Sequence, residues 1–202
     1  TFKDIIIKDI SLRHTIRNTG LLQQLAVWLV SNTGRRITGN SLRKAFQISS
    51  SSTVMEYLSY FVNAWLFFFV PRFSYSLKVQ SVNPKKVYAI DNGFIRANSI
   101  AFTSDHGRLL ENLFYLHLRR ITSGIYYFSE QKECDFVVFE KDKPVSLYQV
   151  CLQLDQENME REMSGLLEAL NFFDRENGII ITLDQADQFE IDGKTICVKP
   201  FY

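Results

Sequence analysis

Cysteine is scarce in this sequence, and its scarcity excludes two kinds of small domain. The 202 residues include only three cysteines, Cys134, Cys151 and Cys197. An odd number without Cys-x-x-Cys spacing argues against a disulfide framework and against a structural zinc site. We therefore expect a chain that resides in the reducing cytoplasm.

Long apolar runs and a large net charge are also missing. The longest apolar run, residues 58–70, is interrupted by Ser59 and Asn63 and is shorter than the roughly 20 residues that a membrane-spanning helix needs. Lys and Arg number 23 against 22 Asp and Glu, so the formal net charge of +1 does not indicate a nucleic-acid-binding protein. Any basic surface must be local. No secretory signal is visible, and a chain that begins at Thr1 without Met is expected to be a fragment.

Apolar residues are numerous enough to build a folded core. They make up 46% of the chain, which is sufficient for one or two compact domains. The stretch Asn83-Pro84-Lys85-Lys86 combines turn-forming and charged residues, which indicates a boundary. We expect one domain over residues 1–82 and a second over residues 83–202.

Helical periodicity dominates the first of these regions. The predicted elements are helices at residues 16–31, 38–46 and 51–62, followed by strands at residues 65–70 and 74–79. The two strands flank Pro71-Arg72-Phe73 and would form a hairpin. Helix, short helix, longer helix and hairpin is the order of a winged helix-turn-helix domain.

A winged helix-turn-helix domain would place several polar residues where they could contact a nucleic acid. Ser51, Ser52 and Thr53 would lie at the start of the third helix, where free backbone N–H groups suit phosphate oxygens. Arg72 and Lys78 would lie on the wing. The third helix contains a glutamate and no lysine or arginine, which weakens its capacity to read bases. The same module could equally serve only in packing, so DNA contact stays one of two alternatives.

The second region alternates between helices and strands. The predicted elements are a helix at 107–120, hairpin strands at 126–129 and 136–139, a strand at 145–152, a helix at 160–173, a strand at 178–182 and a final hairpin around residues 192–193. This alternation predicts a mixed sheet covered by helices. We therefore expect the whole chain to belong to the α/β or α+β class. Gly193-Lys194-Thr195 lies in a hairpin rather than before a helix, so it is not a phosphate-binding loop.

Four polar side chains of the second region fall on three separate elements. Glu111 borders the apolar stripe of a helix. A carboxylate is unusual at such a position, which suggests a functional role. Asp135 lies inside a strand, where aspartate is disfavoured. Gln149 and Cys151 share one face of the next strand because strand side chains alternate.

This arrangement resembles the core of the PD-(D/E)XK nucleases. The resemblance implies that Glu111 is the helix acid and Asp135 the main metal ligand, and that both hold Mg²⁺, which prefers hard oxygen ligands. Gln149 would occupy the second acidic position and Cys151 the lysine position. An amide is a weaker ligand than a carboxylate, and a thiol cannot act as an ammonium group does. The resemblance therefore implies a nuclease-like fold with a degenerate hydrolytic site.

At a larger scale the sequence resembles the C-terminal half of prokaryotic AAA+-type ATP-binding proteins, which carry a domain of unknown function after the ATPase. The segments that carry this resemblance are residues 49–57, 86–93, 107–112, 133–137 and 147–151, together with Arg161-Glu162. The resemblance implies a Walker-type ATPase upstream as partner, with ATP bound there and not in this chain. It also implies a winged helix followed by a nuclease-like domain.

Alternatives remain open at this point. Glu111 could pair with Arg108 on a solvated edge, and Gln149 and Cys151 could be ordinary buried residues. Three functions follow from the pattern. The first, which we favour, is a nucleic-acid-binding module of an ATPase. This module is nuclease-like, but its own hydrolytic site is degenerate. The others are an active Mg²⁺-dependent DNA endonuclease and a protein-interaction or homo-oligomerisation module that regulates the ATPase.

Overall fold

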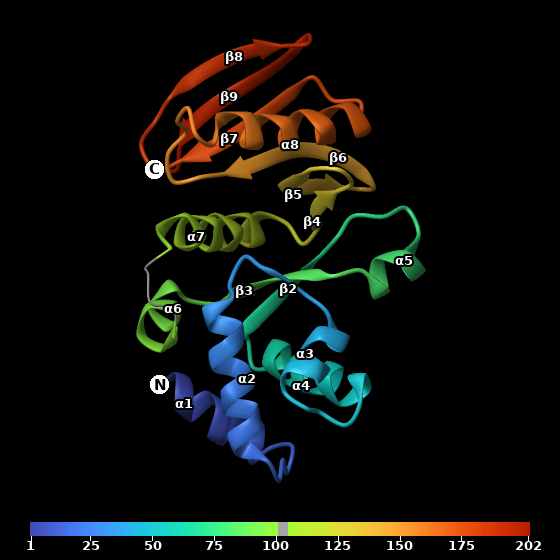
Figure 1. Cartoon of the computed structure of the whole chain (residues 1–202), viewed down its shortest axis with the longest axis vertical. Helices are drawn as coiled ribbons and strands as arrows, with labels where there is room; N and C mark the ends of the chain where they lie inside the picture. The colour runs from blue at the N-terminus through green and yellow to red at the C-terminus, as the bar shows by residue number, and fades with distance from the viewer. Residues whose placement is uncertain (101–104) are drawn as a thin grey trace. The chain divides into compact units, whose positions relative to one another are not determined.

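The computed structural model describes residues 1–100 and 105–202 (Figure 1). The chain divides into two compact units, which we call the first unit (Thr1–Phe69 with Pro84–Ser104) and the second unit (Val70–Asn83 with Asp105–Tyr202). This division differs from the expected boundary at residue 83, because each unit takes in a segment from the other side of it. Both units combine helices and strands, in agreement with the expected α+β class.

The first unit is mainly helical. Its helices are α1 (Phe2–Asp4), the π-helix η1 (Ile5–Ser11), α2 (Thr19–Ser31), α3 (Gly39–Ala45), α4 (Ser51–Asn63) and α6 (Asn92–Asn98). The helices α2, α3 and α4 match the three predicted ones, and the side chains of Asn18, Thr38 and Ser50 cap their first turns by accepting backbone N–H bonds. The amino-terminal helical segment was not predicted, although Ile6 and Ile10 are buried at helical spacing.

A three-stranded sheet completes the first unit. Its strands lie in the order β1 (Arg36–Ile37), β3 (Lys85–Ala89) and β2 (Phe67–Pro71), and β1 and β3 are antiparallel. Phe67 and Val87 pack with residues of α2 and α4 in one apolar core. The strand β3 lies after the expected boundary, yet its burial in this core explains why it belongs to the first unit.

The predicted strand at residues 74–79 is wrong. Residues Leu77–Val82 form the short helix α5, and the hydroxyl of Ser76 caps it by accepting the N–H of Val79 at 3.4 Å. The neighbour of β2 in the sheet is therefore β3 and not a strand of a local hairpin. Lys78, which we expected on a wing, lies on α5 instead.

The second unit is built on a six-stranded mixed sheet with the order β4-β5-β6-β7-β9-β8. Its strands are β4 (Ile125–Ser129), β5 (Glu133–Glu140), β6 (Lys143–Val150), β7 (Asn177–Thr182), β8 (Asp187–Ile191) and β9 (Lys194–Pro200). The pairs β6–β7 and β7–β9 are parallel, and the other pairs are antiparallel. The parallel pair β6–β7 is joined by the crossover helix α8 (Met159–Phe172), and the helix α7 (His106–Ile121) precedes β4.

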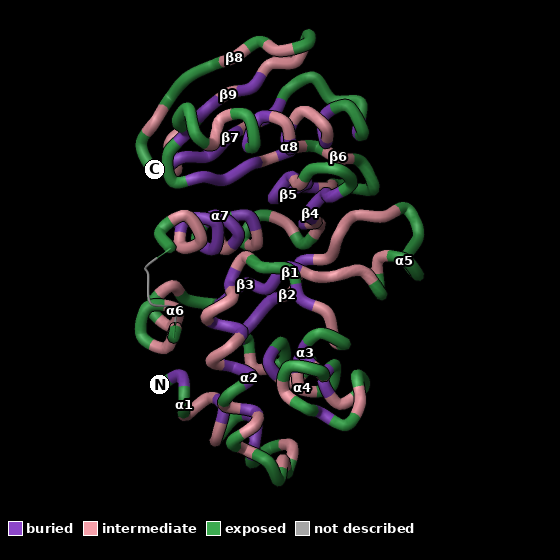
Figure 2. Tube along the Cα trace, in the orientation of Figure 1, coloured by how far each residue is buried: buried purple, intermediate pink, exposed green. Residues whose placement is uncertain are grey.

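The sheet and α8 enclose the apolar core of the second unit, which runs along the buried parts of the strands (Figure 2). Cys134, Val137 and Leu147 from the sheet pack in one cluster with Leu166 and Leu170 of α8. Close approach of α8 to β5 is possible because residue 165 is glycine: a Cβ atom there would lie 2.1 Å from the carbonyl oxygen of Glu133. This contact fixes the place of α8, and with it the polar side chains that α8 carries.

Replacing Gly165 with alanine tests this packing. We expect Gly165→Ala to lower the free energy of unfolding by about 3 kcal/mol, because either the helix or β5 must move. Urea denaturation of the full chain measures the loss. Gly107→Ala is the matched control: Gly107 is also helical and its nearest neighbouring atom, in the side chain of Asp105, lies at 3.4 Å. If Gly165→Ala is as stable as this control, the packing is not as tight as described.

Candidate functional site

Glu111 lies on the buried side of α7. The helix starts at Asp105, whose carboxylate accepts the N–H of Arg108 at 3.1 Å and pairs with the guanidinium of Arg108 at 2.9 Å. Leu110, Phe114 and Leu118 form the buried stripe of the helix, and Glu111 is only 9% exposed beside them. Glu111 is therefore a largely buried residue.

Asp135 and Gln149 meet across the antiparallel pair β5–β6. The backbone N–H of Asp135 donates to Oε1 of Gln149 at 3.2 Å, and Oδ2 of Asp135 accepts the N–H of Val150 at 2.9 Å. Both side chains are 7% exposed. One hydrogen bond thus joins Asp135 to Gln149, and a second joins the carboxylate of Asp135 to the backbone of Val150, the residue after Gln149.

Glu162 completes this group, and the sequence analysis did not assign it a role. Its carboxylate accepts a hydrogen bond of 2.6 Å from Nε2 of Gln149 and pairs with the guanidinium of Arg161, while the side chain is 4% exposed. A signal for it was present, because Glu162, Leu166, Ala169 and Leu170 recur at helical spacing on the buried face of α8. We call Asp135, Gln149 and Glu162 the carboxylate–amide network.

Cys151 follows the end of β6 and lies next to this network. Burial raises the pKa of its thiol to about 12. The nearby carboxylates of Glu162 and Asp135 raise this pKa as well, and Arg161 opposes them. At neutral pH the side chain is therefore an uncharged thiol, which cannot supply the positive charge of a catalytic lysine.

A pocket of about 550 Å³ opens over the network. Glu111, Cys151 and Glu162 line it, whereas Asp135 and Gln149 are not among its lining residues and reach it only through Val150 and Glu162. The charged side chains of the lining are Asp105, Arg108, Glu111, Asp155, Arg161 and Glu162. Four carboxylates against two guanidinium groups make this pocket unfavourable for a nucleic-acid phosphate.

Protein hydrogen bonds already engage the polar groups of Gln149 and Glu162. The oxygen of Gln149 already accepts a backbone N–H, its amide nitrogen is directed at Glu162, and Arg161 covers one oxygen of Glu162. Within residues 1–100 and 105–202, no group of three or more His, Cys, Asp or Glu side chains is arranged to hold a metal ion. Internal hydrogen bonds thus satisfy the amide of Gln149 and part of the carboxylate of Glu162.

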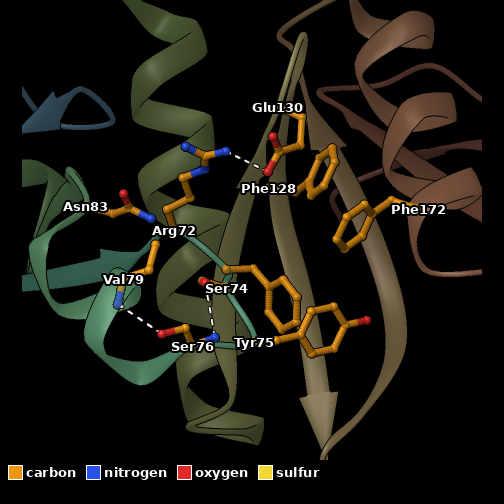
Figure 3. Close-up of a pocket in the computed structure, with 10 residues that line it drawn as sticks. Arg72, Ser74, Tyr75, Ser76, Val79, Asn83, Phe128, Glu130 and Phe172 are labelled. Atoms are coloured by element: carbon orange, nitrogen blue, oxygen red, sulfur yellow. Dashed lines mark hydrogen bonds and ion pairs between the residues drawn. The ribbon is translucent and has the colours of Figure 1, made fainter.

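The five residues expected to contact a nucleic acid fall in different units. Ser51 and Ser52 are exposed at the start of α4, and Thr53 is half-buried with its N–H bonded to Ser50. Arg72 belongs to the second unit, where its guanidinium pairs with Glu130 at 2.6 Å (Figure 3). Lys78 is exposed on α5, also in the second unit.

Charge divides sharply between the two units, which the net charge of the whole chain conceals. The first unit contains eleven Lys and Arg against four Asp and Glu, a formal charge of +7. The second contains twelve against eighteen, a formal charge of −6. Exposed cations of the first unit include Arg35 and Lys44, which the sequence analysis did not single out. The difference in charge becomes clear only when residues 84–104 are counted with the first unit, because this segment adds cations to it.

Comparisons with known proteins give a family but no activity. A family model described as Domain of unknown function (DUF8612) matches residues 1–104. An uncharacterized protein of Methanocaldococcus jannaschii is 31% identical over 98% of this chain and 47% of its own length, and one of Haemophilus influenzae is 26% identical over 95% and 48%. The chain thus spans about half the length of these curated relatives. No solved structure matches it significantly. No helix among the described residues is both long and apolar enough to cross a membrane.

The raised pKa of Cys151 can be tested by alkylation. We expect iodoacetamide at pH 9 to modify Cys151 far more slowly than the partly exposed Cys197, as followed by mass spectrometry of peptides, because the reactive thiolate is scarce. Glu162→Gln removes a negative charge that raises this pKa, so alkylation of Cys151 should become several-fold faster. Glu160→Gln, at an exposed position of the same helix, should leave the rate unchanged. Equal wild-type rates at the two cysteines would contradict the assignment.

The carboxylate–amide network can be tested by changing one atom of Gln149. Gln149→Glu places a second carboxylate against Glu162, and we expect a loss of about 3 kcal/mol in unfolding free energy at pH 7, because the two buried negative charges repel each other and Arg161 pairs only with Glu162. The loss should shrink as pH falls, since protonating one carboxyl restores a donor. Adding Glu162→Gln should recover most of the stability at pH 7. Denaturation of the three proteins measures this, and an undiminished stability of Gln149→Glu would rule out the network.

Proposed function

We propose a function for this chain, which belongs to the family described as Domain of unknown function (DUF8612), from its charges and its site. In this proposal the chain is a nucleic-acid-binding module whose first unit binds the nucleic acid. Its second unit is nuclease-like and does not hydrolyse the bound strand. The single observation that carries the proposal is the charge of +7 on the first unit beside −6 on the second.

The first unit supports binding by its order of elements as well as by its charge. The helix α2, strand β1, helices α3 and α4, and strands β2 and β3 occur in the order of a winged helix-turn-helix domain, with α5 of the second unit inserted between β2 and β3. In that assignment α4 is the recognition helix, and its first turn exposes Ser51 and Ser52. Lys44 is exposed on α3, which packs against α4. Such a surface suits the phosphate backbone more than base edges.

The second unit supports a nuclease-like domain without hydrolysis. Helix, hairpin strand and following strand supply Glu111, Asp135 and Gln149 in the order that the nuclease resemblance implies. Hydrolysis would need a metal ligand at position 149 and a cation at position 151. An amide bound to Glu162 occupies the first position and a neutral thiol the second.

The remaining half of the relatives' length leaves room for a partner domain. We propose that an AAA+-type ATPase precedes this module in the same polypeptide and binds ATP, as the sequence resemblance implies. The module would then tether the ATPase to a nucleic acid. In this proposal the module does not hydrolyse the nucleic acid, so ATP hydrolysis by the ATPase would be the only catalytic activity of the polypeptide.

Binding and cleavage assays on the full chain test the proposal. We expect duplex DNA to bind with an affinity that falls steeply with salt and is the same in Mg²⁺, Mn²⁺ or EDTA, without cleavage. The double variant Arg35→Glu and Lys44→Glu should weaken binding about tenfold or more and flatten the salt dependence. The double variant Lys143→Glu and Lys199→Glu, an equal change of charge at exposed positions of the second unit, should change affinity less than twofold.

Two results would contradict the proposal. Metal-dependent cleavage that Asp135→Asn abolishes would make the chain an active endonuclease. Absence of any nucleic-acid affinity at low salt would favour a protein-interaction module instead.

A further inference from the structure

We propose that the second unit holds an unpaired nucleobase in an aromatic pocket formed by Phe73, Tyr75, Phe128 and Phe172. This inference rests on the proposed function and deepens it, because it names a strand with unpaired bases as the substrate. The pocket is distinct from the one over the carboxylate–amide network, and the two share no lining residue. We call it the aromatic pocket.

The aromatic pocket has the size and lining of a site for a small planar group. Its volume is about 330 Å³, within the range of ligand pockets in proteins. Figure 3 shows rings from three segments converging on it: Tyr75 from the segment after β2, Phe128 from β4 and Phe172 from the end of α8. The rings of Tyr75 and Phe172 are nearly parallel, with an interplanar angle of 27° and centroids 6.1 Å apart.

The floor of the pocket is fixed, whereas its rim is exposed. Phe73 stacks on Phe139 with centroids 4.8 Å apart, and its backbone N–H donates to the carbonyl of Tyr127 at 2.7 Å. These contacts hold the segment that precedes Tyr75. The side chain of Tyr75 itself is 81% exposed and that of Phe172 is 43% exposed. Two exposed rings above a fixed floor form a stacking platform, and every base has a face that can stack on it.

Polar groups at one side of the aromatic pocket suit the edge of a base. Arg72 supplies N–H donors and Glu130 supplies carboxylate acceptors, and the two are paired at 2.6 Å (Figure 3). Ser74 and Asn83 add further polar groups to the lining. An unpaired base presents donors and acceptors that match such a pair, whereas base pairing in a duplex uses this edge. The recognition would therefore select single-stranded over double-stranded nucleic acid.

Local charge favours this pocket over the other one in the same unit. Its lining has one cation and one anion, so it lacks the excess of carboxylates found over the network. Lys78 is exposed on α5 next to Val79, which lines the pocket. Its ammonium group belongs to the same short helix as Val79 and could contact a phosphate on either side of a stacked base. Arg72 and Lys78, expected from the sequence to contact a nucleic acid, keep that role in a different structural setting.

Fluorescence anisotropy of the full chain with two labelled DNAs tests the inference. One is a blunt duplex, and the other is the same duplex with a 3′ tail of about ten unpaired nucleotides, a length within the site sizes of single-strand binders. We expect the tailed DNA to bind roughly tenfold more tightly, since stacking of a base on an aromatic ring contributes on that scale. Tyr75→Ala should abolish most of this difference and leave the affinity for the blunt duplex unchanged.

Two control variants separate stacking from other effects. Tyr75→Phe keeps the ring and should keep the preference for the tail. Tyr202→Ala removes an equally exposed tyrosine outside the aromatic pocket and should have no effect. Photocrosslinking of 5-iodouracil in the tail should label the peptide that contains Tyr75, which gives a readout on the wild-type chain without any substitution.

The outcomes distinguish this inference from the function on which it rests. Blunt-duplex binding without a preference for the tail overturns the aromatic pocket as a base site and leaves the proposed function in place. A preference for the tail that survives in Tyr75→Ala also overturns it. Absence of binding to either DNA overturns both this inference and the proposed function. The aromatic pocket would then be interpreted as a binding site for an aromatic side chain of a protein partner.

Discussion

The burial of carboxylates beside the main sheet is the constraint on which the second unit depends. Asp135 and Glu162 are both less than a tenth exposed, and two such charges are costly unless hydrogen bonds or opposite charges compensate them. Gln149 provides part of this compensation, since its amide donates to Glu162 while its oxygen accepts from the backbone of Asp135. Arg161 provides another part. Hydrogen bonds and an ion pair from the chain's own groups in this way stabilise the buried carboxylates.

In our proposal, the separation of charge gives the two units different roles. An acidic unit repels phosphate groups and a basic one attracts them, so a nucleic acid would be drawn to the first unit even though the chain is nearly neutral overall. In our proposal the second unit makes its contact through stacking in the aromatic pocket, an interaction that depends little on net charge.

Local patterns in the sequence predicted most of the helices and strands, but not the contacts between them. The spacing of apolar residues located α2, α4 and α7, because helical periodicity is a local property. The strand positions of Asp135 and Gln149 followed from alternation in the same way. Glu162 was missed because its contact to Gln149 joins a helix to a strand, and no local pattern shows that partner. The apolar residues of α5 led to the wrong prediction of a strand at residues 74–79. The place of β3 in the first unit could not be predicted, because it depends on packing with helices distant in the sequence.

Amide hydrogen exchange of the full chain with and without a blunt DNA duplex tests the central claim most directly, because it reports on both units at once. The account predicts that the duplex protects backbone amides of the first unit around α3 and α4, and that Mg²⁺ alone changes nothing in peptides covering residues 105–162. Metal-dependent protection around Asp135, or duplex protection confined to the second unit, would contradict it.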